Sequence, residues 1–459
     1  MTSKFSPQRY FCTVLITLLA ACGPLVPEQI GTPTATSAPN FTPVIQGSTV
    51  RPAKTPLVLS PTPLPLLPLD NLRMAYIVDG NLYIQDGSNA PIPLTNSRAD
   101  LDPIFSDDGE KIVFYRGKIN DNNNVYSINA DGSQEQALIT NDWLTTLGSG
   151  TKAGPLAFVP STHRLMFNTY LCAEDLSLGC TTGLFLVDTD TGGIKELLPP
   201  SSAGYLPFGG GSPWHGNFKV SPDGELLSVA MSGHIDIFNI DGKVIRRNIM
   251  TYTRSTPIEL FPRVYWLPDI SGLIVALPAE SNYGGGYEIS PTYSVWRYSF
   301  DRNTAVQIPL EPSPMWIYME CSDVMYVSPD GNWVIFNRLE DNAQLYAGNL
   351  SNWHTQSYQM GIDCSPAYWS ADNRHFVYGR LSGTFLGAAD KPLIPIDGNF
   401  LGWVDATHFI YSRFPNERNI LIGVTIEKTI TTYRTGIFLQ EGYNPYSVKF
   451  VILDYKADR

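Results

Sequence analysis

The sequence predicts an all-β fold, a β-propeller of four-stranded blades that follows a signal peptide and a Pro/Thr-rich linker. Three observations lead to this prediction. A short unit built around a tight turn recurs from about residue 71 onwards, and further strand-and-turn segments follow each unit. Aromatic residues make up 12% of the 459 residues, beside 38 glycines and 36 prolines. This composition favours strands and turns over helices.

Residues 1–21 have the features of a secretory leader. Lys4 and Arg9 are basic, and the apolar stretch after them ends at Ala21. This stretch is well short of the roughly 20 residues that a membrane-spanning helix needs, so a signal peptide is the better interpretation. Leu19-Ala20-Ala21-Cys22 resembles the lipobox of bacterial lipoproteins. The resemblance implies cleavage before Cys22 and attachment of lipid (diacylglyceryl and palmitate) to it; a plain secretory leader containing a cysteine is the alternative.

A lipid on Cys22 would make the membrane one partner and place the chain outside the cytoplasm, anchored to the cell membrane. Gly23 is not an aspartate retention signal, which favours the outer membrane in a cell with two membranes. Residues 22–70 then form a Pro/Thr/Ser-rich linker without helical or strand periodicity. Such a segment is extended, partly as polyproline II, and acts as a spacer.

The repeating part is predicted to span residues 71–459. Its clearest units are FSDDGEKIVF, VSPDGELLSV and VSPDGNWVIF, which begin at Phe105, Val220 and Val327; weaker units begin at Phe158, Trp266, Trp369 and Trp403. Pro222 and Pro329 fix φ at the first turn position, and Gly224 and Gly331 allow the positive φ that closes a short hairpin. Four strands at a spacing of about fifty residues are typical of propeller blades.

These units resemble the WD40-like repeat of the TolB-type propellers. The resemblance covers most of the chain after the linker and implies a propeller fold. It departs from TolB in the lipobox and in the linker that stands in place of TolB's extra N-terminal domain, so TolB's partners are not transferred.

The number of blades depends on how the ring closes. Seven units have an inner strand, whereas the segment from Met74 has only outer strands and the strand-like segment from Tyr446 has no unit of its own. If the C-terminal strand completes the first blade, the ring has eight blades and no exposed edge. Seven blades is the alternative.

Propeller topology places the short SPDG-type and ADGS-type turns on one face and the long loops on the other. Loops on a rigid scaffold commonly carry binding sites. The predicted binding residues on the long-loop face are aromatic, which suits a protein or glycan partner: Tyr205, Phe208, Trp214, Tyr283, Tyr287, Trp316 and Tyr318. Packing of these rings against the blade ends is the other interpretation.

Four cysteines of the mature chain are predicted to form disulfides, since an even number outside the cytosol favours pairing. Cys172 and Cys180 would close one loop, and Cys321 and Cys364 would join successive blades; four free thiols is the alternative.

The same face carries acidic residues that could form a cation site or an acid/base pair: Glu280, Glu288, Glu320, Asp323 and Asp363. Solvated rim charges are the simpler interpretation. Cys-x2-Cys spacing, EF-hand spacing, G-x-S-x-G, H-E-x-x-H and the P-loop do not occur, so neither a metal nor a cofactor is expected. A net charge of -12 without a basic run after the leader argues against nucleic acid.

The leading hypothesis is therefore a non-enzymatic, membrane-anchored binding or scaffolding lipoprotein that presents its long-loop face to a protein or glycan of the envelope. A carbohydrate-active hydrolase or lyase that uses loop carboxylates is the main alternative, and a structural spacer is the third. An enzyme requires two converging carboxyl groups, at least one of them desolvated.

Overall fold

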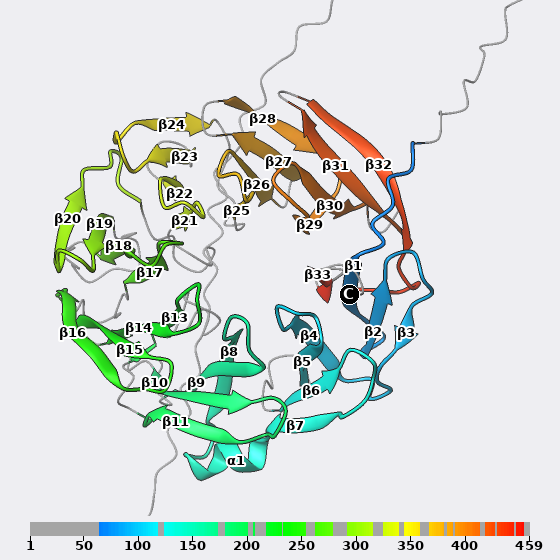
Figure 1. Ribbon diagram of the computed structural model, residues 1–459, viewed down its shortest axis with the longest axis horizontal. Coiled ribbons are helices and arrows are strands. Elements are labelled where there is room, and N and C mark those ends of the chain that lie inside the picture. Colours follow the sequence, from blue (N-terminus) through cyan, green and yellow to red (C-terminus); the bar gives the residue numbers. More distant parts are fainter. Residues whose placement is uncertain are drawn as a thin grey trace, which may run out of the picture. The chain divides into compact units, whose positions relative to one another are not determined.

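The chain folds into a ring of eight antiparallel blades, as the computed structural model shows (Figure 1). The structure describes residues 64–117, 124–172, 180–200, 205–206, 217–231, 233–253, 262–278, 292–314, 325–338, 344–358, 367–380, 383–388, 391–413, 418–426, 429–444 and 447–453. The predictions of an all-β fold and of eight blades are confirmed. In the described part of the chain, no helix is long and apolar enough to cross a bilayer.

Each blade is a four-stranded meander, named here from its innermost strand outwards. Blade 1 contains β33 (Lys449–Ile452), β1 (Leu72–Val78), β2 (Asn81–Asp86) and β3 (Ile92–Pro93); blade 2 contains β4 (Asp100–Phe105), β5 (Lys111–Arg116), β6 (Val125–Asn129) and β7 (Gln136–Ile139). Blade 3 contains β8 (Lys152–Phe158), β9 (Arg164–Cys172), β10 (Cys180–Asp188) and β11 (Ile194–Leu198); blade 4 contains β13 (Phe218–Val220), β14 (Leu226–Met231), β15 (His234–Asn239) and β16 (Val244–Thr251).

The other four blades repeat this order. Blade 5 contains β17 (Arg263–Trp266), β18 (Gly272–Pro278), β19 (Tyr293–Ser299) and β20 (Thr304–Ile308); blade 6 contains β21 (Met325–Val327), β22 (Trp333–Arg338), β23 (Gln344–Asn349) and β24 (Thr355–Tyr358). Blade 7 contains β25 (Ala367–Trp369), β26 (His375–Arg380), β27 (Gly383–Ala388) and β28 (Lys391–Ile396); blade 8 contains β29 (Asn399–Trp403), β30 (His408–Ser412), β31 (Asn419–Ile426) and β32 (Thr429–Phe438).

The ring closes through blade 1, whose inner strand comes from the C-terminal end of the chain. β33 pairs antiparallel with β1, with Leu72 opposite Ile452 and Ala75 opposite Lys449. Figure 1 shows β33, in red, beside the blue β1. The pairing covers the edge of β1 that an incomplete blade would leave exposed, as the sequence predicts.

The turn between the first two strands of a blade is held by a serine and an aspartate two residues later. In blade 2, Asp108 Oδ1 accepts bonds from Ser106 Oγ (2.6 Å) and from the backbone N–H of Glu110 (3.0 Å). Lys111 N donates back to Ser106 Oγ at 3.0 Å. The turns of blades 4, 6 and 7 repeat these bonds around Asp223, Asp330 and Asp372. The predicted positive φ occurs at Gly224 (73°) and Gly331 (68°).

Neighbouring blades are joined by apolar packing and by a recurring tryptophan bond. Ile274 and Val295 of blade 5 pack in one buried cluster with Val334 and Phe336 of blade 6. Three tryptophans at the ends of inner strands donate Nε1–H to a carbonyl of the preceding inner strand: Trp266 to Lys219 (3.0 Å), Trp369 to Tyr326 (2.9 Å) and Trp403 to Tyr368 (3.0 Å).

Two segments differ from the sequence prediction. The region from Asn141, expected as a loop, contains the helix α1 (Asn141–Thr146), because Thr140 caps its first turn by accepting from Trp143 N at 3.2 Å. The end of the predicted linker is ordered against blade 8: Arg434 N donates to Pro65 O (2.8 Å), and Leu67 N donates to Arg434 O (2.8 Å).

Candidate functional site

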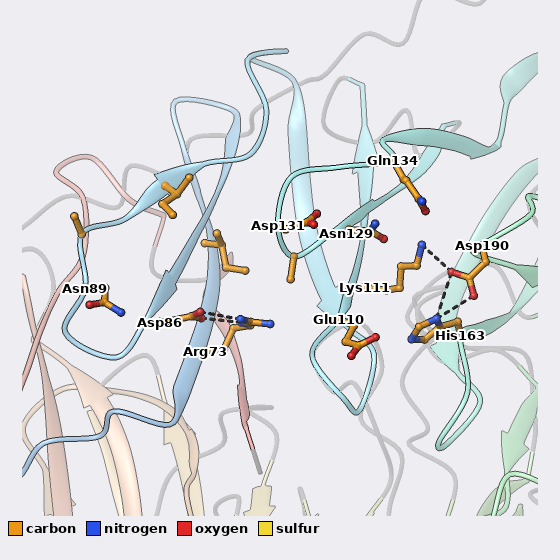
Figure 2. Close-up of a pocket in the computed structure, with 14 residues that line it drawn as sticks. Arg73, Asp86, Asn89, Glu110, Lys111, Asn129, Asp131, Gln134, His163 and Asp190 are labelled. Carbon is orange, nitrogen blue, oxygen red and sulfur yellow. Dashed lines mark hydrogen bonds and ion pairs between the residues drawn. The ribbon is translucent and has the colours of Figure 1, made fainter. Parts of the chain in front are cut away.

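A polar cleft of about 640 Å³ crosses blades 1, 2 and 3 on the face that carries the short turns (Figure 2). Its walls come from β1 and β2, from the start of β5, and from the turns that follow β6, β8 and β10. The charged and amide side chains that line it are Arg73, Asp86, Asn89, Glu110, Lys111, Asn129, Asp131, Gln134, His163 and Asp190. Its volume lies within the range of small-molecule sites.

Four charged groups form a continuous network between blades 2 and 3. Lys111 Nζ lies 2.8 Å from Asp190 Oδ1, and Lys111 is only 3% exposed. His163 bridges two carboxylates, with Nδ1 at 3.0 Å from Asp190 Oδ2 and Nε2 at 2.9 Å from Asp108 Oδ2. Figure 2 shows Lys111 and His163 approaching Asp190 from different sides. These contacts confirm that the SPDG-type and DTDTGG-type turns share one face.

The network shifts the pKa values of its members. Lys111 beside Asp190 is the main reason that the pKa of this carboxyl lies below its usual range, with His163 contributing. Partial burial alone would raise the pKa of Asp108, but bonds from Ser106, from the backbone of Glu110 and from His163 lower it. Partial burial alone would lower the pKa of His163, but the two carboxylates raise it. Asp108 and Asp190 are therefore anions at neutral pH.

A second ion pair lies on the blade 1 side of the cleft. Arg73 Nε and Nη2 donate to the two carboxylate oxygens of Asp86, both at 2.7 Å. Arg73 Nη1 also donates to the carbonyl of Gly109 at 3.0 Å, which links blade 1 to the first turn of blade 2. This fork-shaped geometry fixes both side chains, so the cleft is bounded by charges that neutralise one another.

One group of side chains has the donors for a metal ion. Asp108, Glu110 and His163 place one ligand atom each within 4.8 Å of one another. The sequence does not single them out, because His163 is 55 positions from Asp108 and follows no metal-ligand spacing. Only the equivalence of the short turns in successive blades points to their proximity.

The predicted binding and acidic residues fall almost entirely outside the described part of the chain. This holds for Cys22, for Phe208, Trp214, Tyr283, Tyr287, Trp316 and Tyr318, and for Glu280, Glu288, Glu320, Asp323 and Asp363. Tyr205 is the exception. Its backbone belongs to a short strand, β12 (Tyr205–Leu206), and pairs with Thr181 of β10, so this position extends blade 3 instead of lying in a loop.

Two of the four mature-chain cysteines can be placed. Cys172 and Cys180 lie at the facing ends of β9 and β10, directly opposite each other in register, and not within a loop as expected. Directly opposite residues in an antiparallel pair have Cα atoms about 4.5–5.5 Å apart, a spacing that a disulfide can bridge. Cys321 and Cys364 lie outside the described residues, and both bridges stay predictions.

The chain matches no protein-family model, and no curated protein matches it. Solved structures with a similar fold include the oligogalacturonate lyase of Vibrio parahaemolyticus (13% identity; 69% of this chain and 85% of that one; TM-score 0.44). They also include TolB of Acinetobacter baumannii (13%; 71% and 78%; 0.34) and the β-propeller domain of the Trilobed protease of Pyrococcus furiosus (14%; 75% and 100%; 0.40). Similarity this distant says nothing about the ligand or activity of this chain.

Proposed function

We propose that this chain is a lipid-anchored, extracytoplasmic binding module that presents its long-loop face to a protein or glycan partner. The rigid eight-bladed ring provides the scaffold, with blade 1 closed by β33. The lipobox-like segment ending at Cys22 provides the membrane anchor, and the linker separates the ring from the bilayer.

The state of the cleft carboxyl groups favours binding over catalysis. A hydrolase or lyase of the alternative hypothesis needs one carboxyl whose pKa is raised, so that it can deliver a proton. Asp108 and Asp190 converge on His163, but their pKa values are lowered and both are hydrogen-bonded anions. Asp131 is also kept ionised, by the hydroxyl and backbone N–H of Ser133, which lower its pKa. The cleft is therefore equipped for polar recognition.

The binding proposal is tested by capture from envelope extract with the full chain as bait. The test variant carries Trp214→Ala and Trp316→Ala together, and the control carries Trp353→Ala, which removes an exposed tryptophan from the turn between β23 and β24 on the short-turn face. We expect a partner that wild type and control retain and the double variant loses. Equal capture by all three would exclude the long-loop face, and polysaccharide cleavage abolished by Glu280→Gln or Asp363→Asn would establish the enzyme alternative.

The anchoring proposal has its own test. Cys22→Ala removes the only atom to which the lipid can be attached, so the variant should leave the membrane fraction and appear in the soluble extracytoplasmic fraction. Cys12→Ala, inside the leader, is the matched control and should remain membrane-bound. A Cys22→Ala protein that stays in the membrane fraction would contradict the lipid anchor.

A further inference from the structure

We propose that Asp108, Glu110 and His163 bind a divalent transition-metal ion at the boundary between blades 2 and 3. The site lies on the short-turn face and is independent of the proposed binding by the long-loop face. Glu110 and His163 line the open cleft, whereas Asp108 approaches from the turn beside it. An ion held there would keep coordination positions open towards the cleft.

The positions of the donor atoms suit such an ion. Metal bonds to imidazole nitrogen and carboxylate oxygen are about 2.0–2.2 Å long, so neighbouring ligand atoms lie roughly 3.0–3.5 Å apart. His163 Nε2 and Asp108 Oδ2 are 2.9 Å apart, and the whole donor set lies within 4.8 Å. The ion would take the place of the proton between these two atoms, and that proton would pass to solvent.

Each donor is directed by contacts outside the donor set. Asp108 uses Oδ1 to accept from Ser106 and from the Glu110 backbone, which leaves Oδ2 for His163 or an ion. His163 donates from Nδ1 to Asp190, and Asp190 is paired with the buried ammonium of Lys111. A carboxylate on the far nitrogen of a histidine is the usual support of a metal-binding imidazole, because it fixes the tautomer with a lone pair on Nε2.

The chain contains an internal comparison that lacks the histidine. The turn Asp108-Gly109-Glu110 recurs in blade 4 as Asp223-Gly224-Glu225, with the equivalent bond from the Glu225 backbone to Asp223 Oδ1 (3.1 Å). Three residues after the turn proline, the following blade has His163 in the first case and Ser271 in the second. Among the described residues, only the first of these turns belongs to a group with metal-binding donors.

The donor set also indicates the class of ion. One imidazole and two carboxylates suit Zn²⁺ or Mn²⁺ better than Ca²⁺, which prefers six or more oxygen ligands. Two carboxylates balance the charge of a divalent ion, so the site is neutral when occupied.

The proposal is tested with the purified full chain, stripped with a chelator and titrated with Mn²⁺ or Zn²⁺ at about pH 8, where histidine ligands are deprotonated. Mn²⁺ is included because thiolates favour Zn²⁺ over it, so the cysteines interfere less. Calorimetry and metal analysis after dialysis give the affinity and the stoichiometry. We expect one equivalent in wild type and in Glu225→Gln, and at least about tenfold weaker binding in Glu110→Gln, which loses a direct ligand.

Glu110→Gln is the decisive variant, because no hydrogen bond or ion pair of the Glu110 side chain is part of the blade 2–blade 3 network, so folding should be retained. Asp190→Asn keeps all three donors but weakens the support of His163, and should lower the affinity about 10- to 100-fold. No bound ion in wild type, or equal binding by wild type and Glu110→Gln, would overturn the proposal.

Discussion

At the scale of single residues, the first turn of each blade combines a serine–aspartate bond pair with a left-handed residue. Gly224 has φ of 73°, and a Cβ there would lie 2.8 Å from the carbonyl oxygen of Pro160 in the preceding blade. Glycine at this position thus serves both the turn and the approach of two blades. Asn373 takes the left-handed position in blade 7, with φ of 61°, since asparagine tolerates this conformation better than most residues.

Gly224→Ala should destabilise the protein more than Gly192→Ala does. Both glycines have φ of 73°, but the nearest atom to a Cβ at Gly192 is the flexible Gln136 Oε1 at 3.6 Å. We expect a loss of about 1–2 kcal/mol for Gly192→Ala from backbone strain alone. For Gly224→Ala we expect about 2–4 kcal/mol, because the carbonyl must also move. Denaturant midpoints of the two variants measure the difference; equal midpoints would show that the blades separate freely here.

The turn aspartates also predict how stability depends on pH. Partial burial alone would raise the pKa values of Asp372 and Asp405, but hydrogen bonds from neighbouring backbone and side-chain groups outweigh it and lower both. A lowered folded-state pKa stabilises the protein above the unfolded value of about 3.9, and this contribution disappears as pH falls through the folded value. The melting temperature should therefore fall below about pH 4, and less steeply in Asp372→Asn. An unchanged slope in this variant would assign the acid sensitivity to other groups.

Residue-scale signals explain which parts of the structure could be predicted from sequence. The turns at Gly224 and Gly331 are local, because a few adjacent residues contain both the hydrogen-bonding groups and the backbone freedom that close them. The cleft is not local: Arg73, Lys111, His163 and Asp190 come from three blades and meet only in the closed ring. Their residue types are ordinary for surface turns, so no spacing rule reveals them.

At the scale of the elements, the inner strands are joined by hydrogen bonds as well as by apolar packing. Trp369 ends β25 and donates across the blade boundary to Tyr326 of β21. The indole thus fills space between two blades and satisfies a carbonyl of the neighbouring strand. Tryptophan stands at the corresponding position of three units, Trp266, Trp369 and Trp403, and each makes the same type of bond.

Trp369→Phe should keep most of the packing but lose the bond to Tyr326 O, which is 2.9 Å long. We expect a loss of about 1–2 kcal/mol, because the carbonyl would be left without this donor. Trp353→Phe is the control, since Trp353 is 55% exposed in the turn after β23, and it should change stability by less than about 0.5 kcal/mol. Chemical unfolding compares the two, and a Trp369→Phe protein as stable as the control would show that the bond contributes nothing.

At the scale of the whole molecule, the ring depends on one pairing between distant parts of the chain. β33 supplies the inner strand of blade 1, and Phe450 packs in the cluster that also contains Met74 and Ile422. The prediction of eight blades follows from this pairing, because the segment from Met74 lacked an inner strand and the C-terminal segment lacked a blade.

A truncation after Val448 should open the ring. It removes β33 and exposes the edge of β1, so we expect a melting temperature lower by several degrees, faster proteolysis within blade 1 and a tendency to aggregate. A truncation after Leu453 keeps all of β33 and should behave like the full chain. Limited proteolysis with mass-spectrometric mapping tests this; cleavage that begins in another blade would show that β33 is not the closing element.

The pairing of β33 with β1 also sets an order in time. A ribosome produces β1 among the first strands of the ring and β33 as the last of those described. Blades 2 to 8 are each built from consecutive segments and can form as synthesis proceeds, whereas blade 1 must wait for nearly the whole chain. A nascent chain therefore carries an unpaired β-edge for almost the entire duration of its synthesis, and this strand is where a holding chaperone would be needed most.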